Sequence, residues 1–194
     1  MIKMTNVSKE WKIVWKTQDL VDNSFVNFIK HKFESMPSYY VGGIPSFSSS
    51  NLSDVICLKD KLLEYDSSLA LARGGLWQSY VLSLFGLLMA IVDLKRKGNG
   101  STWRPIDNLE SLSLENKKIL VCDQDCRTGK TLRRATKEIE KYNPKSLGLF
   151  LLFEWNTLKD SIPTDFDETY FPIRTDYNEE GFFEDYLRLY NKLK

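Results

Sequence analysis

Apolar residues recur every four positions near the start of the chain, at Val21, Phe25, Ile29 and Phe33. This spacing predicts an amphipathic helix over residues 19–33. Gly86 and Pro144 are typical of residues that end a helix, and each follows a further segment with helical character. The remaining pattern predicts helices over residues 52–65, 76–85, 129–142 and 180–193, and a loop over the Pro-, Gly- and Ser-rich residues 36–51.

Short apolar runs without helical periodicity lie between these helices. They predict strands in "SLALA" at 68–72, "LLMAIVD" at 87–93, "KILVC" at 118–122 and "SLGLFLLF" at 146–153. Strands that alternate with helices at this spacing indicate βαβ units, and strands that are apolar throughout indicate a sheet covered on both faces. The chain is therefore predicted to be an α/β protein with a Rossmann-like parallel β-sheet flanked by helices.

Composition narrows the range of partners. The 194 residues carry 27 Lys and Arg against 26 Asp and Glu, a net charge of +1, so we expect no nucleic-acid partner. Three cysteines and one histidine make a zinc site unexpected and favour reduced thiols in the cytoplasm. The longest apolar run, 76–92, is shorter than the ~20 residues of a membrane span. The first 16 residues are polar and charged, unlike a signal peptide, so we expect no membrane partner.

The stretch "ILVCDQDCRTGKTL" at 119–132 holds the strongest chemical signal in the chain. Its Gly129-Lys130-Thr131 resembles half of a nucleoside-triphosphate loop, but that motif requires glycine where this chain has Gln124. Carboxylates at a strand end instead suit sugar hydroxyls or Mg²⁺. A Thr-Gly-Lys-Thr turn at a helix N-terminus suits a monophosphate. The residues therefore predict a cradle for a sugar phosphate, and a P-loop NTPase is the weakest alternative.

A second loop, Arg73-Gly74-Gly75, also follows a predicted strand and precedes a predicted helix. Ligands of open α/β sheets bind beyond the carboxyl ends of the strands, where both loops are expected. Glycine lets the backbone approach a ligand closely, although a plain strand-to-helix turn has the same sequence.

Together these motifs resemble the type I phosphoribosyltransferases. The strand, acidic residues and Thr-Gly-x-Thr turn are similar to that family's phosphoribosyl-pyrophosphate (PRPP) motif. "LALARGGL" is similar to its pyrophosphate loop, which is often held by a strained peptide, and "SIPTDFDETYFP" at 161–172 resembles the hood segment of purine-type members. The resemblance implies a nucleotide-salvage enzyme that transfers the 5-phosphoribosyl group from PRPP to a purine nucleobase, with Mg²⁺ as cofactor. It also implies a small hood built from the termini, and a homodimer.

Carried over position by position, the resemblance assigns roles to individual residues. Asp123 would bind the ribose hydroxyls, directly or through Mg²⁺, with Asp125 as a second metal ligand. PRPP would be bound by Arg73, Gly74, Gly75, Asp123, Thr128, Gly129, Lys130 and Thr131. The catalytic set would be Arg73, Asp123, Asp125 and Arg127. The nucleobase would contact Glu154, Tyr170 and Phe171, and Lys95, Arg96, Lys97 and Arg104 would belong to a mobile flap within the polar connection 95–116.

Three residues depart from the family pattern. Gln124 replaces the second acidic residue, although Asp125 is adjacent. Arg127 stands where purine-type members often carry an aspartate, and arginine cannot act as a base at neutral pH. Glu154 stands near a lysine position of six-oxopurine enzymes, and a carboxylate that reaches the base would prefer an amino group or a ring N–H. Two of these residues also have a structural explanation, Glu154 as a solvated strand end and Arg127 as a partner of Asp125 or Asp123 in an ion pair.

These considerations divide the chain into residues 1–50, a helical and loop segment that contributes to the hood, a core at 51–160, and a C-terminal hood segment and helix at 161–194. The second function that fits the sequence is a regulatory protein that binds PRPP or a nucleotide without transfer, which Gln124 and Arg127 favour.

Overall fold

The computed structural model describes residues 9–32, 49–97, 100–105, 107, 109–153, 162–172 and 182–194. The chain divides into two compact units. One unit combines the two ends of the chain, residues 1–57 and 174–194, and the other contains residues 58–173. The second unit contains both loops singled out in the sequence.

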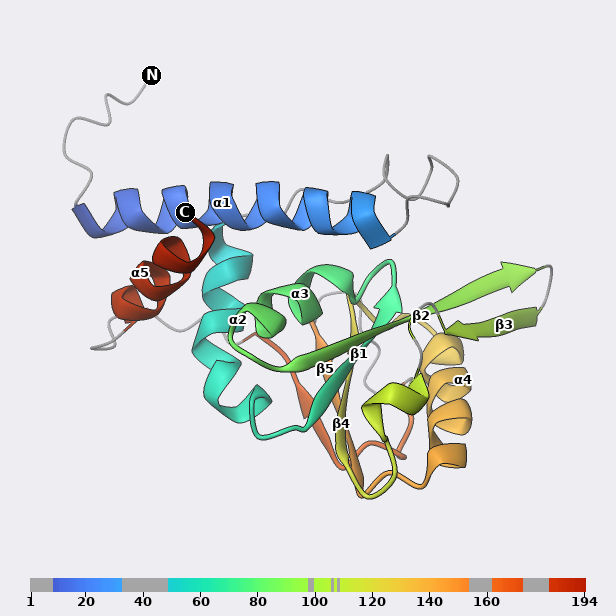
Figure 1. The fold of residues 1–194 in the computed structure, drawn as a ribbon. Coiled ribbons are helices and arrows are strands. Elements are labelled where there is room, and N and C mark those ends of the chain that lie inside the picture. Colours follow the sequence, from blue (N-terminus) through green and yellow to red (C-terminus); the bar gives the residue numbers. More distant parts are fainter. Residues whose placement is uncertain are drawn as a thin grey trace. The chain divides into compact units, whose positions relative to one another are not determined.

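The larger unit is built around a six-stranded sheet with the order β3-β2-β1-β4-β5-β6. Five strands run parallel, and β3 at one edge is antiparallel to β2. Strand β1 lies in the middle of the sheet, where it pairs with β2 on one side and with β4 on the other (Figure 1). The strands are β1 (Ser67–Ala72), β2 (Leu88–Lys97), β3 (Gly100–Pro105), β4 (Lys118–Asp123), β5 (Ser146–Leu151) and β6 (Glu168–Tyr170).

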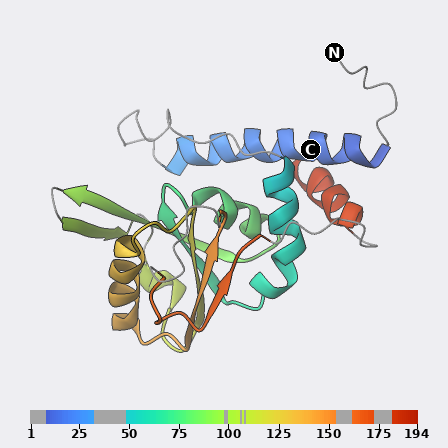
Figure 2. The same ribbon diagram turned by 180° about the vertical axis from the view of Figure 1, so that it is seen from behind.

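Alternate residues of the strands are buried on opposite faces of the sheet. On one face, Leu147, Leu149 and Leu151 of β5 pack in a core with Leu132 and Ile139 of helix α4 (Lys130–Ile139). Figure 2 shows α4 along this side of the sheet. Helix α3 (Leu76–Leu84) packs against β1, β2 and β4. Two short 3₁₀ turns, η2 (Leu109–Leu112) and η3 (Glu140–Tyr142), complete the described elements of this unit.

The smaller unit contains α1 (Lys9–Lys32), α5 (Phe182–Leu193) and the first part of α2 (Ser49–Leu62). Helix α1 buries a continuous stripe at Val14, Val21, Phe25 and Ile29. Tyr186 of α5 is fully buried in the same unit. Its hydroxyl lies 2.5 Å from Ser53 Oγ, and its carbonyl lies 3.2 Å from Thr17 Oγ1.

The prediction of a parallel α/β sheet flanked by helices is confirmed, while several boundaries differ. Helix α1 begins at Lys9 instead of Asp19, because Thr17 and Gln18 continue its buried face although both are polar. The predicted loop at 36–51 lies largely outside the described residues, and α2 already begins at Ser49.

The prediction of a polar connection over residues 95–116 is wrong for the first part of this range. Strand β2 continues to Lys97 and pairs with β3, so that Val92 faces Pro105 and Lys97 faces Gly100. This two-stranded arm extends beyond the rest of the sheet in Figure 1. The strand could not be recognised from its charged residues, because a hairpin at the edge of a sheet does not need apolar side chains on either face.

Residues 162–172 belong to the larger unit, because β6 adds to the sheet beside β5, with Glu168 opposite Gly148 and Tyr170 opposite Phe150. Within the described residues, no helix has the length and apolar character needed to cross a bilayer.

Candidate functional site

The Arg73-Gly74-Gly75 loop makes a tight turn between β1 and α3. The Gly75 amide donates to the Leu71 carbonyl at 2.8 Å, and the Leu76 amide donates to the Arg73 carbonyl at 3.2 Å. The Ala72–Arg73 peptide bond is cis. The Arg73 side chain is exposed, whereas Gly75 is buried.

This loop lies directly against the end of β4. A Cβ atom on Gly74 would fall 2.2 Å from Asp123 Oδ1, and one on Gly75 would fall 1.8 Å from the Cys122 carbonyl oxygen. The contact follows from the topology, because β1 and β4 are adjacent parallel strands whose carboxyl ends meet at one edge of the sheet. The structure therefore brings together the two motifs, which are about 50 residues apart in sequence.

The end of β4 is held from both sides. Asp123 is half-buried, and its Oδ1 accepts a hydrogen bond from the Gln124 amide at 2.8 Å. Its carbonyl accepts hydrogen bonds from Gln78 Nε2 at 2.6 Å and from the Leu152 amide at 3.3 Å. The Phe153 amide donates to the Gln124 carbonyl at 2.9 Å. The backbone at the first acidic residue is thus fixed by α3 and by the segment after β5.

Gln78 was not singled out from the sequence as a site residue. The signal that could have found it is a large polar side chain inside the apolar run 76–92. Such a residue in a helix that is otherwise buried needs a specific hydrogen-bond partner. That partner, the Asp123 carbonyl, is 45 residues away in sequence.

Asp125 and Arg127 form an ion pair in the loop after β4. Arg127 Nε lies 3.4 Å from Asp125 Oδ2, and the two side chains are 74% and 28% exposed. An exposed ion pair of this kind contributes little to stability. Arg127 is therefore available to contact an anion in the same loop.

Residues 128–131, hereafter the phosphate loop, lead into α4. Gly129 has a φ of 66° in the left-handed region, and α4 begins at Lys130. Glycine has no side chain to cap the helix, so the amides of the first turn can point toward an anion. The Thr128 and Lys130 side chains are exposed. Arg133 Nη2 donates to the Thr128 carbonyl at 2.5 Å, which connects the loop to the first turn of α4.

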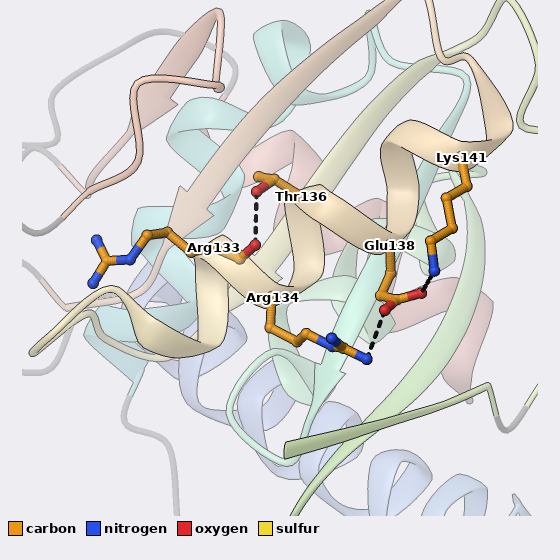
Figure 3. A network of polar contacts seen from close by, with 5 residues as sticks. All are labelled: Arg133, Arg134, Thr136, Glu138 and Lys141. Carbon is orange, nitrogen blue, oxygen red and sulfur yellow. Dashed lines mark hydrogen bonds and ion pairs between the residues drawn. The ribbon is translucent and has the colours of Figure 1, made fainter. Parts of the chain in front are cut away.

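Arg133 and Arg134 differ in what they contact, as Figure 3 shows. The Arg134 guanidinium lies 2.7 Å from Glu138 Oε1, and Lys141 Nζ lies 2.5 Å from Glu138 Oε2. The Arg133 side chain points away from this cluster (Figure 3). Of these two neighbouring arginines, therefore, the one that contacts the phosphate loop is Arg133.

Of the three predicted base-binding residues, Tyr170 and Phe171 lie in the described part of the chain, and their side chains contact different neighbours. Glu154 lies outside the described residues. The Tyr170 hydroxyl donates to Glu168 Oε2, and its ring meets the Tyr65 ring edge-on with centroids 6.1 Å apart. Phe171 packs at the margin of the core beneath α4. Their contact with a nucleobase remains a prediction.

The two cysteines of the opening stretch are buried. Burial raises the pKa of the Cys122 thiol to about 12, although the nearby Ser79 side chain opposes the shift. Burial also raises the pKa of Cys126, against a hydrogen bond from the Gly129 backbone. Both are therefore neutral thiols at physiological pH and act as apolar packing beneath the loop.

The carboxylates of Asp123 and Asp125 fit a Mg²⁺ site of the kind completed by substrate. Mg²⁺ is commonly held by one or two carboxylates together with substrate phosphates and water. In the described part of the chain, no group of three or more acidic, histidine or cysteine side chains could hold a metal by itself. The residues present therefore suit a metal that arrives with a phosphorylated ligand.

An α/β sheet with two glycine-containing loops at its carboxyl edge is typical of proteins that bind phosphorylated ligands. The phosphoribosyl transferase domain family matches residues 69–180, more than half of the chain, and includes both loops. The chain belongs to this family, which confirms the resemblance seen in the sequence, and the protein is a phosphoribosyltransferase.

Two solved structures illustrate the likeness. A hypoxanthine-guanine phosphoribosyltransferase from Bacillus anthracis str. 'Ames Ancestor' matches with a TM-score of 0.52 at 14% identity, over 66% of this chain and 80% of that one. A purine phosphoribosyltransferase from Pyrococcus horikoshii Ot3 matches with a TM-score of 0.49 at 24% identity, over 66% of this chain and 90% of that one. No curated protein matches the sequence. The first of these structures supports the fold.

Proposed function

We propose that the protein transfers the 5-phosphoribosyl group of PRPP to a purine nucleobase and releases pyrophosphate. The observation that carries this proposal is the contact between the Arg73-Gly74-Gly75 loop and the end of β4. A Cβ atom on Gly74 would fall 2.2 Å from Asp123 Oδ1. This closeness supports a loop that binds pyrophosphate beside a carboxylate that binds hydroxyls, because the pyrophosphate on C1 and the 2′ hydroxyl of PRPP are on adjacent carbon atoms.

In this proposal, different residues bind the 5′-phosphate, the ribose and the pyrophosphate of PRPP. The phosphate loop binds the 5′-phosphate through its backbone amides, its threonine hydroxyls and Lys130. Asp123 accepts hydrogen bonds from the ribose 2′ and 3′ hydroxyls. Arg73 and the amides of Gly74 and Gly75 bind the pyrophosphate. The half-buried position of Asp123 and the exposed position of Arg73 suit these two tasks.

Asp123 and Asp125 would hold Mg²⁺ together with the pyrophosphate of the substrate. When bound, Mg²⁺ supplies positive charge that stabilises the leaving group. The chain's own cations contribute in the same direction, because Arg73 and Arg127 are exposed at the two loops. These charges act where negative charge develops in the transition state.

The reaction exchanges one bond at C1 for another. The C1–O bond to pyrophosphate breaks as an unprotonated ring nitrogen of the nucleobase donates its electron pair to C1, and the base then loses a proton from another ring nitrogen. Arg127 cannot accept this proton at neutral pH. In our proposal the proton passes to the departing pyrophosphate, whose oxygen has gained the electron pair of the broken bond. Arg127 then acts through its charge.

The β2–β3 arm carries Lys95, Arg96, Lys97 and Arg104, and we propose that it closes over the bound substrate. Closure would exclude water from a ribosyl cation that is readily hydrolysed. The sheet register places Asp93 opposite Arg104 and Lys95 opposite Thr102, so the basic residues lie on adjoining strands of one hairpin.

The test is to incubate the protein with Mg²⁺, PRPP and single nucleobases while pyrophosphate release is measured. Release with one purine, lost in Asp123→Asn and retained in Lys137→Ala, is the expected result. Lys137 is the matched control because it is an exposed basic residue of the same helix as Lys130, beyond the phosphate loop. PRPP binding without release under any base would instead support the regulatory alternative. ATP hydrolysis abolished by Lys130→Ala would contradict the proposal.

A further inference from the structure

Gln78 is a fully buried polar side chain beside the candidate site. It lies in the first turn of α3, and its exposed fraction is 0%. Burying a carboxamide is unfavourable unless its polar atoms find hydrogen-bond partners. Gln78 Nε2 has one, because it donates to the Asp123 carbonyl at 2.6 Å. Gln78 Oε1 has no hydrogen-bond partner among the described residues.

This combination is unfavourable as a means of stabilising the core. An apolar side chain of the same size would fill the same volume without leaving a buried acceptor unsatisfied. Replacing Gln78 by an apolar side chain should cost little, because the Asp123 carbonyl keeps its hydrogen bond from the Leu152 amide. The Gln78 side chain therefore contributes little to the folding free energy, and its hydrogen bond fixes the position of the Asp123 carbonyl.

The geometry shows what it fixes. Gln78 lies three residues after Gly75, so it connects the helix that follows the Arg73-Gly74-Gly75 loop to the last residue of β4. The same Asp123 carbonyl accepts from the Leu152 amide at 3.3 Å. With its carbonyl held from two sides, the Asp123 backbone is fixed next to Gly74.

We propose that Gln78 is a positioning residue that orients Asp123 for the ribose of PRPP by holding its main-chain carbonyl. The proposal rests on the proposed function in naming PRPP as the ligand. The hydrogen bond itself involves no substrate. It predicts that the loss of Gln78 weakens the binding of the sugar phosphate and leaves the binding of the nucleobase unchanged.

The decisive variant is Gln78→Met, which keeps the length of the side chain and removes both polar atoms. We expect the KM for PRPP to rise about tenfold, equivalent to about 1.4 kcal/mol, with the KM for the nucleobase unchanged. The unfolding midpoint should stay within about 2 °C of the wild type or increase. The matched control is Ser67→Ala, because Ser67 Oγ is also buried without a hydrogen-bond partner among the described residues, but at the amino end of β1. Ser67→Ala should leave both KM values unchanged.

A second variant, Gln78→Glu, separates positioning from packing. Burial raises the pKa of a carboxyl group, so the protonated side chain can still donate to the Asp123 carbonyl. We expect its kcat/KM, relative to the wild type, to be at least about threefold higher at pH 6 than at pH 8. An unchanged KM for PRPP in Gln78→Met overturns the proposal. A loss of activity that is matched by a fall in midpoint of more than about 5 °C also overturns it, because Gln78 would then be a packing residue.

Amide hydrogen exchange tests the same inference without any ligand. In Gln78→Met, exchange at the Leu152 amide should accelerate at least about tenfold relative to Ser67→Ala, because this amide donates to the Asp123 carbonyl that has lost its other partner. Failure of the wild-type protein to bind PRPP refutes the proposed function. Unchanged exchange in the variant refutes the role of Gln78.

Discussion

Replacing Gly75 with alanine tests the close approach of the two loops most directly. The added Cβ atom would lie 1.8 Å from the carbonyl oxygen and 2.5 Å from the carbonyl carbon of Cys122, and 2.9 Å from the amide nitrogen of Leu71. All three are backbone atoms of β4 and β1, so no side-chain rotation can relieve the contact. Gly75 has a φ of −84°, which alanine adopts readily, so the substitution introduces a steric clash without backbone strain.

The magnitude follows from two opposing terms. Overpacking a well-packed interior costs about 1–3 kcal/mol, and a clash with immovable backbone lies at the upper end of that range. Removing a glycine from the unfolded chain stabilises the protein by about 0.4–1 kcal/mol. The net loss is therefore about 2 kcal/mol, which corresponds to a decrease of about 4–8 °C in the unfolding midpoint of a chain of this size.

Thermal unfolding followed by circular dichroism measures this shift, and Gly74→Ala provides the comparison. A Cβ atom on Gly74 would meet the Asp123 Oδ1 atom at 2.2 Å, and this side-chain atom can rotate away. Its nearest backbone contact, the Gln124 nitrogen at 2.9 Å, is much less severe than the 1.8 Å contact at Gly75. We therefore expect Gly74→Ala to reduce the unfolding midpoint less than Gly75→Ala does. Relative to this decrease in midpoint, Gly74→Ala should weaken PRPP binding more. A midpoint for Gly75→Ala within about 2 °C of the wild type would show that α3 does not approach β4 this closely.

Three further predictions concern the rest of the chain. Arg133→Ala should raise the KM for PRPP several-fold by releasing the phosphate loop, whereas Arg134→Ala, on the same helix, should leave it unchanged in steady-state kinetics. Because burial raises the pKa of the Cys122 thiol to about 12, iodoacetamide at pH 8 should label exposed Cys57 and leave Cys122 unmodified in the native protein, as read by mass spectrometry. Burial also raises the pKa of Tyr186, so its contribution to stability is present below about pH 10 and is lost as the pH rises above that value. Tyr186→Phe should therefore show a smaller fall in unfolding midpoint above pH 10, and an equal fall would contradict the assignment.

Local sequence carried most of the information about the larger unit. Strands β1, β4 and β5 are buried on both faces, so their sequences are nearly continuous apolar runs and could be recognised without any knowledge of their neighbours. The positions of the two loops follow from the same pattern, because a loop after a parallel strand must lie at the carboxyl edge of the sheet. The phosphate loop was likewise visible, since a glycine before a helix and its flanking threonines are local features.

Features that depend on distant partners could not be predicted in this way. Strand β6 has three residues, and its place is defined by its pairing with β5. The β2–β3 arm is rich in charged and polar residues, so its sequence resembles a loop, and pairing along its length supplies the backbone hydrogen bonds. The early start of α1 depends on Thr17, whose hydroxyl lies near the Tyr186 carbonyl 169 residues away.

The sequence by itself determined the order of β1, α3, β2, β4, α4 and β5, and the chemistry that the two loops can offer, because these are properties of short segments. Only the tertiary structure decided that Gly74 and Gly75 lie against Asp123 and Cys122, and that Gln78 holds the Asp123 carbonyl. The physical reason is that these contacts join segments about 50 residues apart. Their geometry is set by the pairing of β1 with β4. This pairing cannot be predicted from the sequence of either strand alone.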